Sequence, residues 1–417
     1  MARTHAVIAL FVAGLMSSIA DAQAPADSSA PPTAQEPTVV NAQETTVASA
    51  AAPAAQDEGG FVDKAKRWAE RTQIIERLNG DIDGWYPRLG GMTRGGGIAA
   101  GPGYRFHVGD TLVDLSAGLS IRSYKAVDAK IRWVNAFDER LQLWTNYRFE
   151  DFPQEDFFGT GMSSSLDTRT NYGFASHEVS VHGIGRPVPW LEIGTVVGYL
   201  NPSIDSGSDD QFPSIEMVFT DTEAPGLAAQ PDFLHATFFA EVDYRDQRGN
   251  PRSGGFYHAA WGIWDDRTLQ QYDFQRFDGN VTQFVPLVAD KTHMVSGQLG
   301  VSYVNNETGN RVPFYFLPYV GGVDTVRSFR EFRFKDENAM WMTAEYNYMP
   351  IKWVSVVAFV DAGKVAPHWN DLDFTGLEPG YGFGFRVHSR KQTFARFNFA
   401  TGGGEGWQTF MKLGVGF

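Results

Sequence analysis

The stretch "FLHATFFAEVDY", residues 233–244, alternates apolar and polar side chains along its whole length. In an extended strand, successive side chains point to opposite faces. One face here would carry Leu234, Ala236, Phe238, Ala240, Val242 and Tyr244, and the other His235, Thr237, Glu241 and Asp243 together with Phe239. Because the charges gather on one face of so long a run, the pattern favours a strand tilted across a membrane over the shorter strands of a soluble β-sandwich.

The same alternation recurs from residue 84 to the last residue of the sequence. We count about sixteen such segments, near 84–92, 96–106, 111–122, 124–137, 141–151, 171–185, 190–200, 232–246, 254–267, 274–287, 292–305, 338–349, 352–363, 380–389, 393–401 and 407–417. An even number of strands lets a sheet close on itself without a free edge. The predicted fold is therefore all-β, a transmembrane antiparallel β-barrel of about sixteen strands over residues 84–417.

The connections between these segments alternate in length. Short ones contain turn-forming residues, as in "HVGD", "FDER", "RPVP" and "NPRSGG". The longest ones, 151–170, 201–231 and 306–337, fall at the opposite strand ends. Short turns at one end and long loops at the other are typical of outer-membrane barrels, whose long loops face outward.

Three segments are expected before the barrel. Residues 1–24 combine Arg3 with a short apolar run and small residues, which predicts a signal peptide and export. Residues 25–60 are rich in Pro, Ala, Ser and Thr and predict a disordered linker. Residues 61–80 have an apolar stripe at helical spacing and predict one amphipathic helix. This helix could plug the barrel, lie on the membrane surface or dock on the periplasmic rim, and the last is the simplest reading.

Composition narrows the range of functions. Glycine (44 residues) and aromatic residues (14%) are abundant, as in barrels in which only alternate residues face lipid. The net charge of -14 argues against nucleic acid as a partner. Because the sequence contains no cysteine, it has no lipid-anchored cysteine, disulfide or thiolate metal site. We expect no cofactor and no metal, and "DSGSDD" (205–210) is better explained as a solvated acidic loop than as a calcium site.

The last segment has a feature of its own. In "GWQTFMKLGVGF", Met411, Leu413, Val415 and Phe417 share one face, and the final residue is aromatic. A soluble edge strand would leave this whole row exposed. A last strand that ends in phenylalanine resembles the signal by which outer-membrane barrels are recognised for insertion, so we expect these four residues to form an insertion signal.

A charged, aromatic stretch follows two glycines in the longest loop. "GGVDTVRSFREFRF", residues 321–334, contains Val326-Arg327-Ser328-Phe329, and the next two predicted strands contain Glu345 and "FVDAG" from Phe359 to Gly363. In this order the motifs resemble the barrel of the BamA/TamA outer-membrane assembly-factor superfamily, also called the bacterial surface antigen family. The resemblance covers residues 84–417, and serine at position 328 departs from the glycine of the family motif.

The resemblance implies a loop that folds into the barrel, where Arg327 pairs with Asp361 and with Glu345 as a second acid. Val326, Phe329, Phe359 and Gly363 belong to the same loop-to-barrel gate. Both acids fall on the polar face of their strands, and an arginine inside a barrel needs an acid because an unpaired buried charge costs several kcal/mol. The alternative is that Arg327 is an ordinary surface charge, whose ion pairs contribute under about 1 kcal/mol.

Family members of this type also have periplasmic POTRA domains of roughly 75 residues, and none fits between Ala24 and Gly84. We therefore expect a periplasmic partner protein to supply the substrate. The resemblance implies a monomeric, non-enzymatic barrel, surrounded by outer-membrane lipid, that inserts or passes polypeptide or lipid. Its first strand, with a proline and two glycines, should pair poorly with the last and leave a weak seam. The alternatives are a passive diffusion pore and, less favoured, an outer-membrane lipase.

Overall fold

The computed structural model describes residues 82–90, 96–133, 140–306, 309–388 and 392–413. The expected signal peptide, linker and amphipathic helix lie outside the described residues. Within the described ranges, no helix is both long and apolar enough to cross a bilayer.

Sixteen strands form one antiparallel sheet and follow each other in chain order, which confirms the predicted fold class and strand number. They are β1 (Gly84–Gly90), β2 (Ala99–Val108), β3 (Thr111–Ser120), β4 (Lys125–Trp133), β5 (Leu141–Phe157), β6 (Thr170–Val188), β7 (Leu191–Ser206), β8 (Phe233–Asp243), β9 (Gly254–Asp266), β10 (Phe274–Pro286), β11 (His293–Asn306), β14 (Asn338–Ile351), β15 (Val354–Ala366), β16 (Glu378–His388), β17 (Thr393–Thr401) and β18 (Trp407–Leu413). Each overlaps one of the predicted segments. A separate pair, β12 (Tyr319–Val320) and β13 (Phe334–Lys335), lies between β11 and β14.

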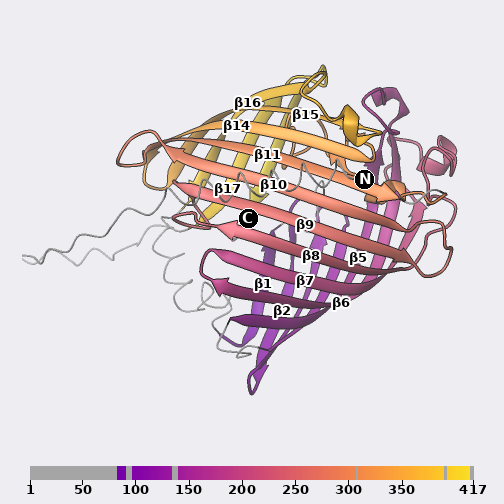
Figure 1. Ribbon diagram of the computed structural model, residues 1–417, viewed down its shortest axis with the longest axis horizontal. Coiled ribbons are helices and arrows are strands. Elements are labelled where there is room, and N and C mark those ends of the chain that lie inside the picture. Colours follow the sequence, from indigo (N-terminus) through magenta and orange to yellow (C-terminus); the bar gives the residue numbers. More distant parts are fainter. Residues whose placement is uncertain (1–81, 91–95, 134–139, 307–308, 389–391, 414–417) are drawn as a thin grey trace, which may run out of the picture. The chain divides into compact units, whose positions relative to one another are not determined.

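The sheet curves round on itself. Figure 1 shows the magenta and orange strands in front, with purple and yellow strands behind them. Cα atoms of β1 and β18, the two ends of the hydrogen-bonded order, come within 8 Å of each other. The first and last strands therefore meet, as the closure of a barrel requires.

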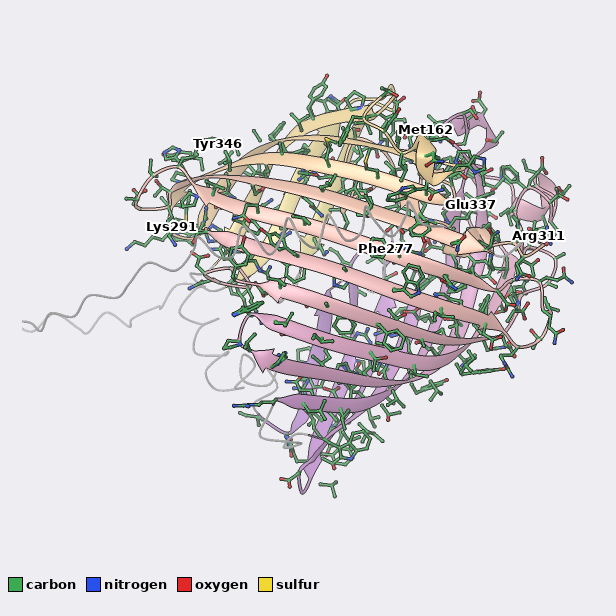
Figure 2. All side chains as sticks on the ribbon, viewed as in Figure 1. Met162, Phe277, Lys291, Arg311, Glu337 and Tyr346 are labelled. Carbon is green, nitrogen blue, oxygen red and sulfur yellow. The ribbon has the colours of Figure 1, made fainter. Side chains whose placement is uncertain are left out.

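The two ends of the barrel differ. The connections 158–169, 207–232 and 307–337 gather at one end, called here the long-loop end, where Arg311 and Glu337 lie (Figure 2). The opposite short-turn end includes the two-residue connections 109–110, 189–190 and 352–353, and Lys291 and Tyr346 lie there (Figure 2).

The two faces of the sheet have opposite polarity. On β8, Leu234 and Phe238 are 43% and 54% exposed, whereas His235 on the other face is only 6% exposed. The outward positions of other strands repeat this pattern with exposed Val127, Ile131, Tyr147, Val179, Val181, Ile193, Val197, Val356, Val360, Tyr381 and Phe383. An apolar surface of this extent has to be covered, and a lipid bilayer covers it.

Three strands are longer than the alternation predicts. β5, β6 and β7 have 17, 19 and 16 residues, so the predicted loops 151–170 and 201–231 begin as strand, over 151–157 and 201–206. Pro153 and the neighbouring acids resemble a turn, but the pairing of β5 with β6 resumes after a bulge between Phe152 and Glu155. The extension is stable because it buries Phe152, Phe157 and Tyr172.

A second apolar core lies at the long-loop end. Phe157, Tyr172, Phe233 and Phe274 from the sheet pack with loop residues that include Ile215 of the short helix Ile215–Met217 and Phe314 of the short helix Phe314–Phe316. Phe314 contacts Phe157 and Tyr172 edge-on, with ring centroids 5.1 Å and 4.8 Å apart. The long loops are therefore folded against the strand extensions.

Candidate functional site: a loop docked on the barrel wall

The loop between β11 and β14 turns back sharply. Tyr319 pairs with Lys335 and Val320 with Phe334, so residues 321–333 form the tip of a hairpin. Gly321 and Gly322 open the tip with φ angles of 121° and 97°, a region that other residues rarely adopt. Thr325 closes it, because its hydroxyl accepts from the Gly321 N–H (2.9 Å) and donates to the Gly321 carbonyl (3.0 Å).

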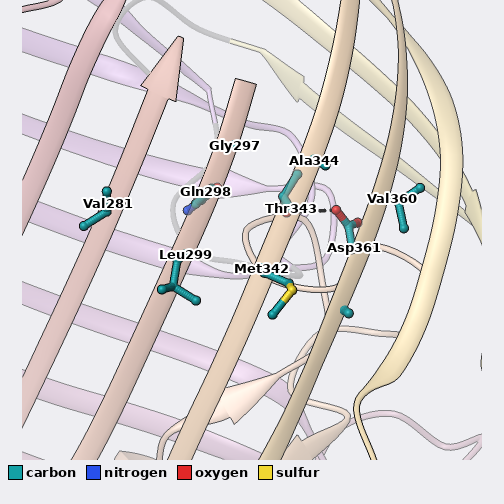
Figure 3. Close-up of a pocket in the computed structure, with 10 residues that line it drawn as sticks. Val281, Gly297, Gln298, Leu299, Met342, Thr343, Ala344, Val360 and Asp361 are labelled. Atoms are coloured by element: carbon teal, nitrogen blue, oxygen red, sulfur yellow. Dashed lines mark hydrogen bonds between the residues drawn. The ribbon is translucent and has the colours of Figure 1, made fainter. Parts of the chain in front are cut away.

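The guanidinium of Arg327 lies against β15. Nε and Nη2 donate to Asp361 Oδ2 and Oδ1 at 2.8 Å and 2.7 Å, and the Arg327 backbone N–H also donates to Oδ2 at 3.1 Å. Thr343 Oγ1 donates to Asp361 Oδ1 at 2.9 Å (dashed line in Figure 3). Asp361 therefore receives four hydrogen bonds, two of them from a bidentate fork.

A second acid completes the pairing. Arg327 Nη1 donates to Glu345 Oε2 on β14 at 3.2 Å, and Arg386 on β16 bonds the other oxygen of Glu345. Arg327 Cζ lies 3.4 Å from the ring centroid of Phe359. Burial opposes the charged form, yet hydrogen bonds and charge from Asp361 and Glu345 raise the pKa of Arg327 above its ordinary value. The cation is thus held between two acids and an aromatic face, with 6% of its surface exposed.

Glycines on the wall make room for the loop. A Cβ at Gly363 would lie 2.9 Å from a methyl of Val326, and one at Gly380 would lie 2.8 Å from Cβ of Ser328. A Cβ at Gly403 would overlap the ring of Phe329. The sequence pointed to Gly363 alone. Gly380 and Gly403 were missed because a close approach from a distant loop leaves no local signal in the sequence.

Arg333 fixes the base of the hairpin. Its Nη1 and Nη2 donate to Oγ and O of Ser164 at 2.9 Å and 2.8 Å, and its Nε bonds Glu405. Asp324 at the tip forms a 3.7 Å ion pair with Lys412 on β18. The hairpin therefore contacts the loop before β6, the connection before β18 and the last strand itself.

The expected insertion residues are only partly described. Met411 is 46% exposed on β18, and Leu413 is the last residue of that strand. Val415 and Phe417 lie outside the described residues.

A shallow apolar groove of about 440 Å³ crosses β11, β14 and β15 next to the site. Gly297, Leu299, Met342, Ala344 and Val360 line it, and Figure 3 shows Val360 beside Asp361 on β15. These residues alternate with inward-facing Gln298, Thr343 and Asp361, which places the groove on the lipid-facing side. Asp361 is the one charged residue among those that line it, and its carboxylate is bonded to Arg327, so the groove offers a place for acyl chains.

One Ser–His pair went unnoticed in the sequence. Ser355 Oγ and His388 Nε2 are hydrogen bonded at 2.7 Å, but Arg252 Nη2 donates to the same Oγ at 2.9 Å. Ser355 is wholly buried, so no ester can reach it. Among the residues that the structure describes, no group of three or more acids and histidines is placed to hold a metal ion.

The fold and the site agree with a comparison to known families. The family model for the Omp85 superfamily domain matches residues 192–410, more than half of the chain. The chain belongs to the Omp85 superfamily. This confirms the family expected from the sequence and identifies the molecule as an outer-membrane β-barrel of the BamA/TamA type.

Two solved structures resemble this Omp85 barrel. BamA from Haemophilus ducreyi lacking POTRA domains 1–3 matches with a TM-score of 0.60 and 14% identity, over 79% of this chain and 70% of that one. CdiB from Escherichia coli matches with a TM-score of 0.52 and 11% identity, over 80% of this chain and 62% of CdiB, less than two thirds of its length. At such identities the likeness shows the fold. No curated protein matches the sequence.

Proposed function

We propose that this Omp85 barrel inserts or translocates a hydrophobic cargo, polypeptide or lipid, at the outer membrane, and that the hairpin tip 321–333 acts as its lumenal gate. The observation that carries the proposal is the Arg327 fork on Asp361 with Glu345 as second acid. A surface loop does not need two buried acids, whereas a loop held inside a lumen does.

The cargo would leave through the junction of β1 and β18. β1 and β18 have only seven residues each. β1 is further weakened by Pro87 and by two glycines, Gly84 and Gly90. The hairpin reaches this junction through Asp324 and Lys412. Movement of the tip is thereby linked to the last strand. We further propose that residues 1–24 direct export, that the barrel acts as a monomer without enzymatic activity, and that a periplasmic partner delivers the cargo.

Photo-crosslinking in living cells tests the proposal. A photoreactive residue at Trp85 or Met411, both exposed on the strands of the junction, should capture the cargo, and one at Phe238 on β8 serves as the control. We expect polypeptide or lipid adducts at the junction that are absent at Phe238. The same adducts at all three positions would contradict the proposal.

A passive pore is the alternative function. In planar bilayers the intact barrel should conduct little, and Arg327→Gln should conduct more. High conductance of the intact barrel, unchanged in Arg327→Gln, would favour the pore.

A further inference from the structure

The connection 244–253 between β8 and β9, called here the strap, is the longest at the short-turn end. Its contacts lie far from its own strands. In the sheet order, β9 and β16 are five positions apart, which at about 4.8 Å per strand is roughly 24 Å along the wall. The strap leaves β8 and returns to β9 within ten residues, yet it contacts strands β14, β15, β16 and β17. A connection this short is too short to follow the wall that far and return, so it has to cross the mouth of the lumen.

Arg252 makes the far contacts. Its Nη1 donates to Asn347 Oδ1 on β14 at 2.7 Å, and its Nη2 donates to Ser355 Oγ on β15 at 2.9 Å and lies 3.4 Å from His388 Nε2 on β16. All four residues are buried, with at most 7% of the surface of any of them exposed. The guanidinium therefore contacts wall strands that lie three to five positions from β9 in the sheet order.

Two backbone contacts extend the crossing to β17. The N–H of Thr393 donates to the Gly249 carbonyl at 2.9 Å, and Gly249 forms a β-bridge with Gln392. Asn250 Nδ2 and His388 Nδ1 are 3.1 Å apart. The strap is therefore paired with the far wall by backbone as well as by side chain.

The near side of the strap is preorganised. Asp246 Oδ1 accepts from the backbone N–H groups of Arg252 and Ser253 at 2.9 Å and 3.1 Å, and Lys291 Nζ donates to Oδ2 at 2.8 Å. Burial alone would raise the pKa of Asp246, but these hydrogen bonds lower it to about 2. The turn that carries Arg252 thus keeps its shape whether or not the far contacts are made.

The chemistry at the far wall differs from that of Arg327. Arg327 pairs with two carboxylates, but the partners of the Arg252 guanidinium are neutral, and its buried Nε has no hydrogen-bond partner among the described residues. A buried cation without a counter-ion is weakly held. The contact of Arg252 with the far wall should therefore break more easily than the ion pairs of Arg327 with Asp361 and Glu345.

His388 supplies the trigger. Arg252 Nη2 and Asn250 Nδ2 have only donors, so the neutral imidazole of His388 can accept from just one of them, through Nε2 or through Nδ1. The charged groups that act on Arg252 are Arg386 on β16 and Asp246 of the strap. A second proton would leave neither imidazole nitrogen able to accept and would place a second cation beside Arg252, so the contacts of both Arg252 and Asn250 would be weakened.

We propose that the strap is a second, releasable closure of the lumen, held at the short-turn end by Arg252 and opened when His388 is protonated. The proposal does not depend on which cargo the barrel handles. It requires only that the strap crosses the mouth and that the Arg252 contact breaks when the imidazole becomes cationic.

Cysteine pairing tests the crossing, since the chain has no cysteine of its own. Residues joined by a β-bridge have Cα atoms close enough for a disulfide, so Gly249→Cys with Gln392→Cys should crosslink in the membrane-inserted, heat-modifiable barrel. A folded barrel that fails to crosslink under oxidation would overturn the proposal.

Conductance tests the release, in Arg327→Gln barrels, because a docked hairpin tip would hide the opening of a second closure in series with it. Burial and the neighbouring guanidinium disfavour a second charge, so pH is lowered from about 7.5 to about 5, below the range in which an ordinary histidine titrates. The reduced cysteine variant should then open at least roughly fivefold more often, and the oxidised one should not respond. His388→Gln keeps an acceptor but cannot become cationic, so it should lose the pH response. Arg248→Gln is the matched control, because Arg248 lies on the same strap but bonds Glu192 and Asp243 on the near wall. A pH response that survives in His388→Gln or in the oxidised pair would overturn the proposal.

Discussion

Replacing Arg327 by glutamine should shift the hairpin tip to a mixture of docked and undocked states without unfolding the barrel. Asp361 has no exposed surface and would lose the bidentate fork, while Glu345 would keep Arg386. Breaking one buried ion pair in this way costs about 3–5 kcal/mol. The burial of Val326 and Phe329, each at most 1% exposed, still favours docking by roughly 1.5–3 kcal/mol per side chain. The two terms are similar in size, which is why a mixture is expected.

Hydrogen exchange of residues 321–333 measures this equilibrium directly. Arg327→Gln should speed exchange in the tip but leave β14 and β15 protected. Arg330→Gln serves as the matched control, because Arg330 lies on the same loop but is exposed, and surface changes of this kind shift stability by less than about 0.5 kcal/mol.

A double-mutant cycle with Asp361→Asn then isolates the pair. We expect a coupling of about 2–4 kcal/mol, within the range measured for close buried charge pairs. A coupling under about 0.5 kcal/mol would show that the contact does not hold the tip, and the reasoning would fail. Neutral replacements are preferable to exchanging the two charges, because Asp361 also accepts from the Arg327 backbone N–H and from Thr343.

Three further outcomes are expected. Gly380→Val should undock the tip by collision with Ser328, whereas Gly297→Val, whose Cβ would meet nothing within 4 Å, should leave it in place; tip exchange rates compare the two. Burial lowers the pKa of Lys335 in the hairpin to about 8, against the opposing effect of Glu155 and Asp156. The docked hairpin should therefore gain stability as pH rises from about 8 toward the ordinary lysine pKa near 10.4. A stability that does not change with pH in the wild type, or a pH profile that is the same in Lys335→Met, would contradict this. Leu413→Arg should destabilise the barrel by roughly 2–4 kcal/mol if it lies near the bilayer midplane, and deletion of Phe417 should lower the yield of heat-modifiable barrel; normal amounts in both would argue against an insertion signal.

Strand alternation predicted the fold because membrane strands alternate lipid-facing apolar residues with lumen-facing polar ones over their whole length. The same parity placed Glu345 and Asp361 on the inward face, and in the structure both bond Arg327. The strap could not be predicted, because Arg252 is more than 100 residues away from Ser355 and His388 in the sequence. Its tight turn residues, "NPRSGG", indicate a connection but not where that connection reaches. The extensions of β5 to β7 were missed for another reason, since they depend on aromatic burial under loops that the alternation does not describe.

The aromatic core at the long-loop end bears on how the protein enters the membrane. Phe157, Tyr172, Phe233, Phe274 and Phe314 come from four strands and one loop. Long loops of outer-membrane barrels face outward, so these residues would meet only after their hairpins have crossed the bilayer. Each ring would contribute roughly 1.5–3 kcal/mol on burial, and this energy is released on the far side alone. The core would therefore oppose the reversal of insertion, because a hairpin that moved back through the bilayer would have to remove its aromatic side chains from this core. Phe314→Ala should accordingly leave the early insertion of β5 and β6 intact but make it reversible, which pulse-chase protection of the long loops from external protease would detect.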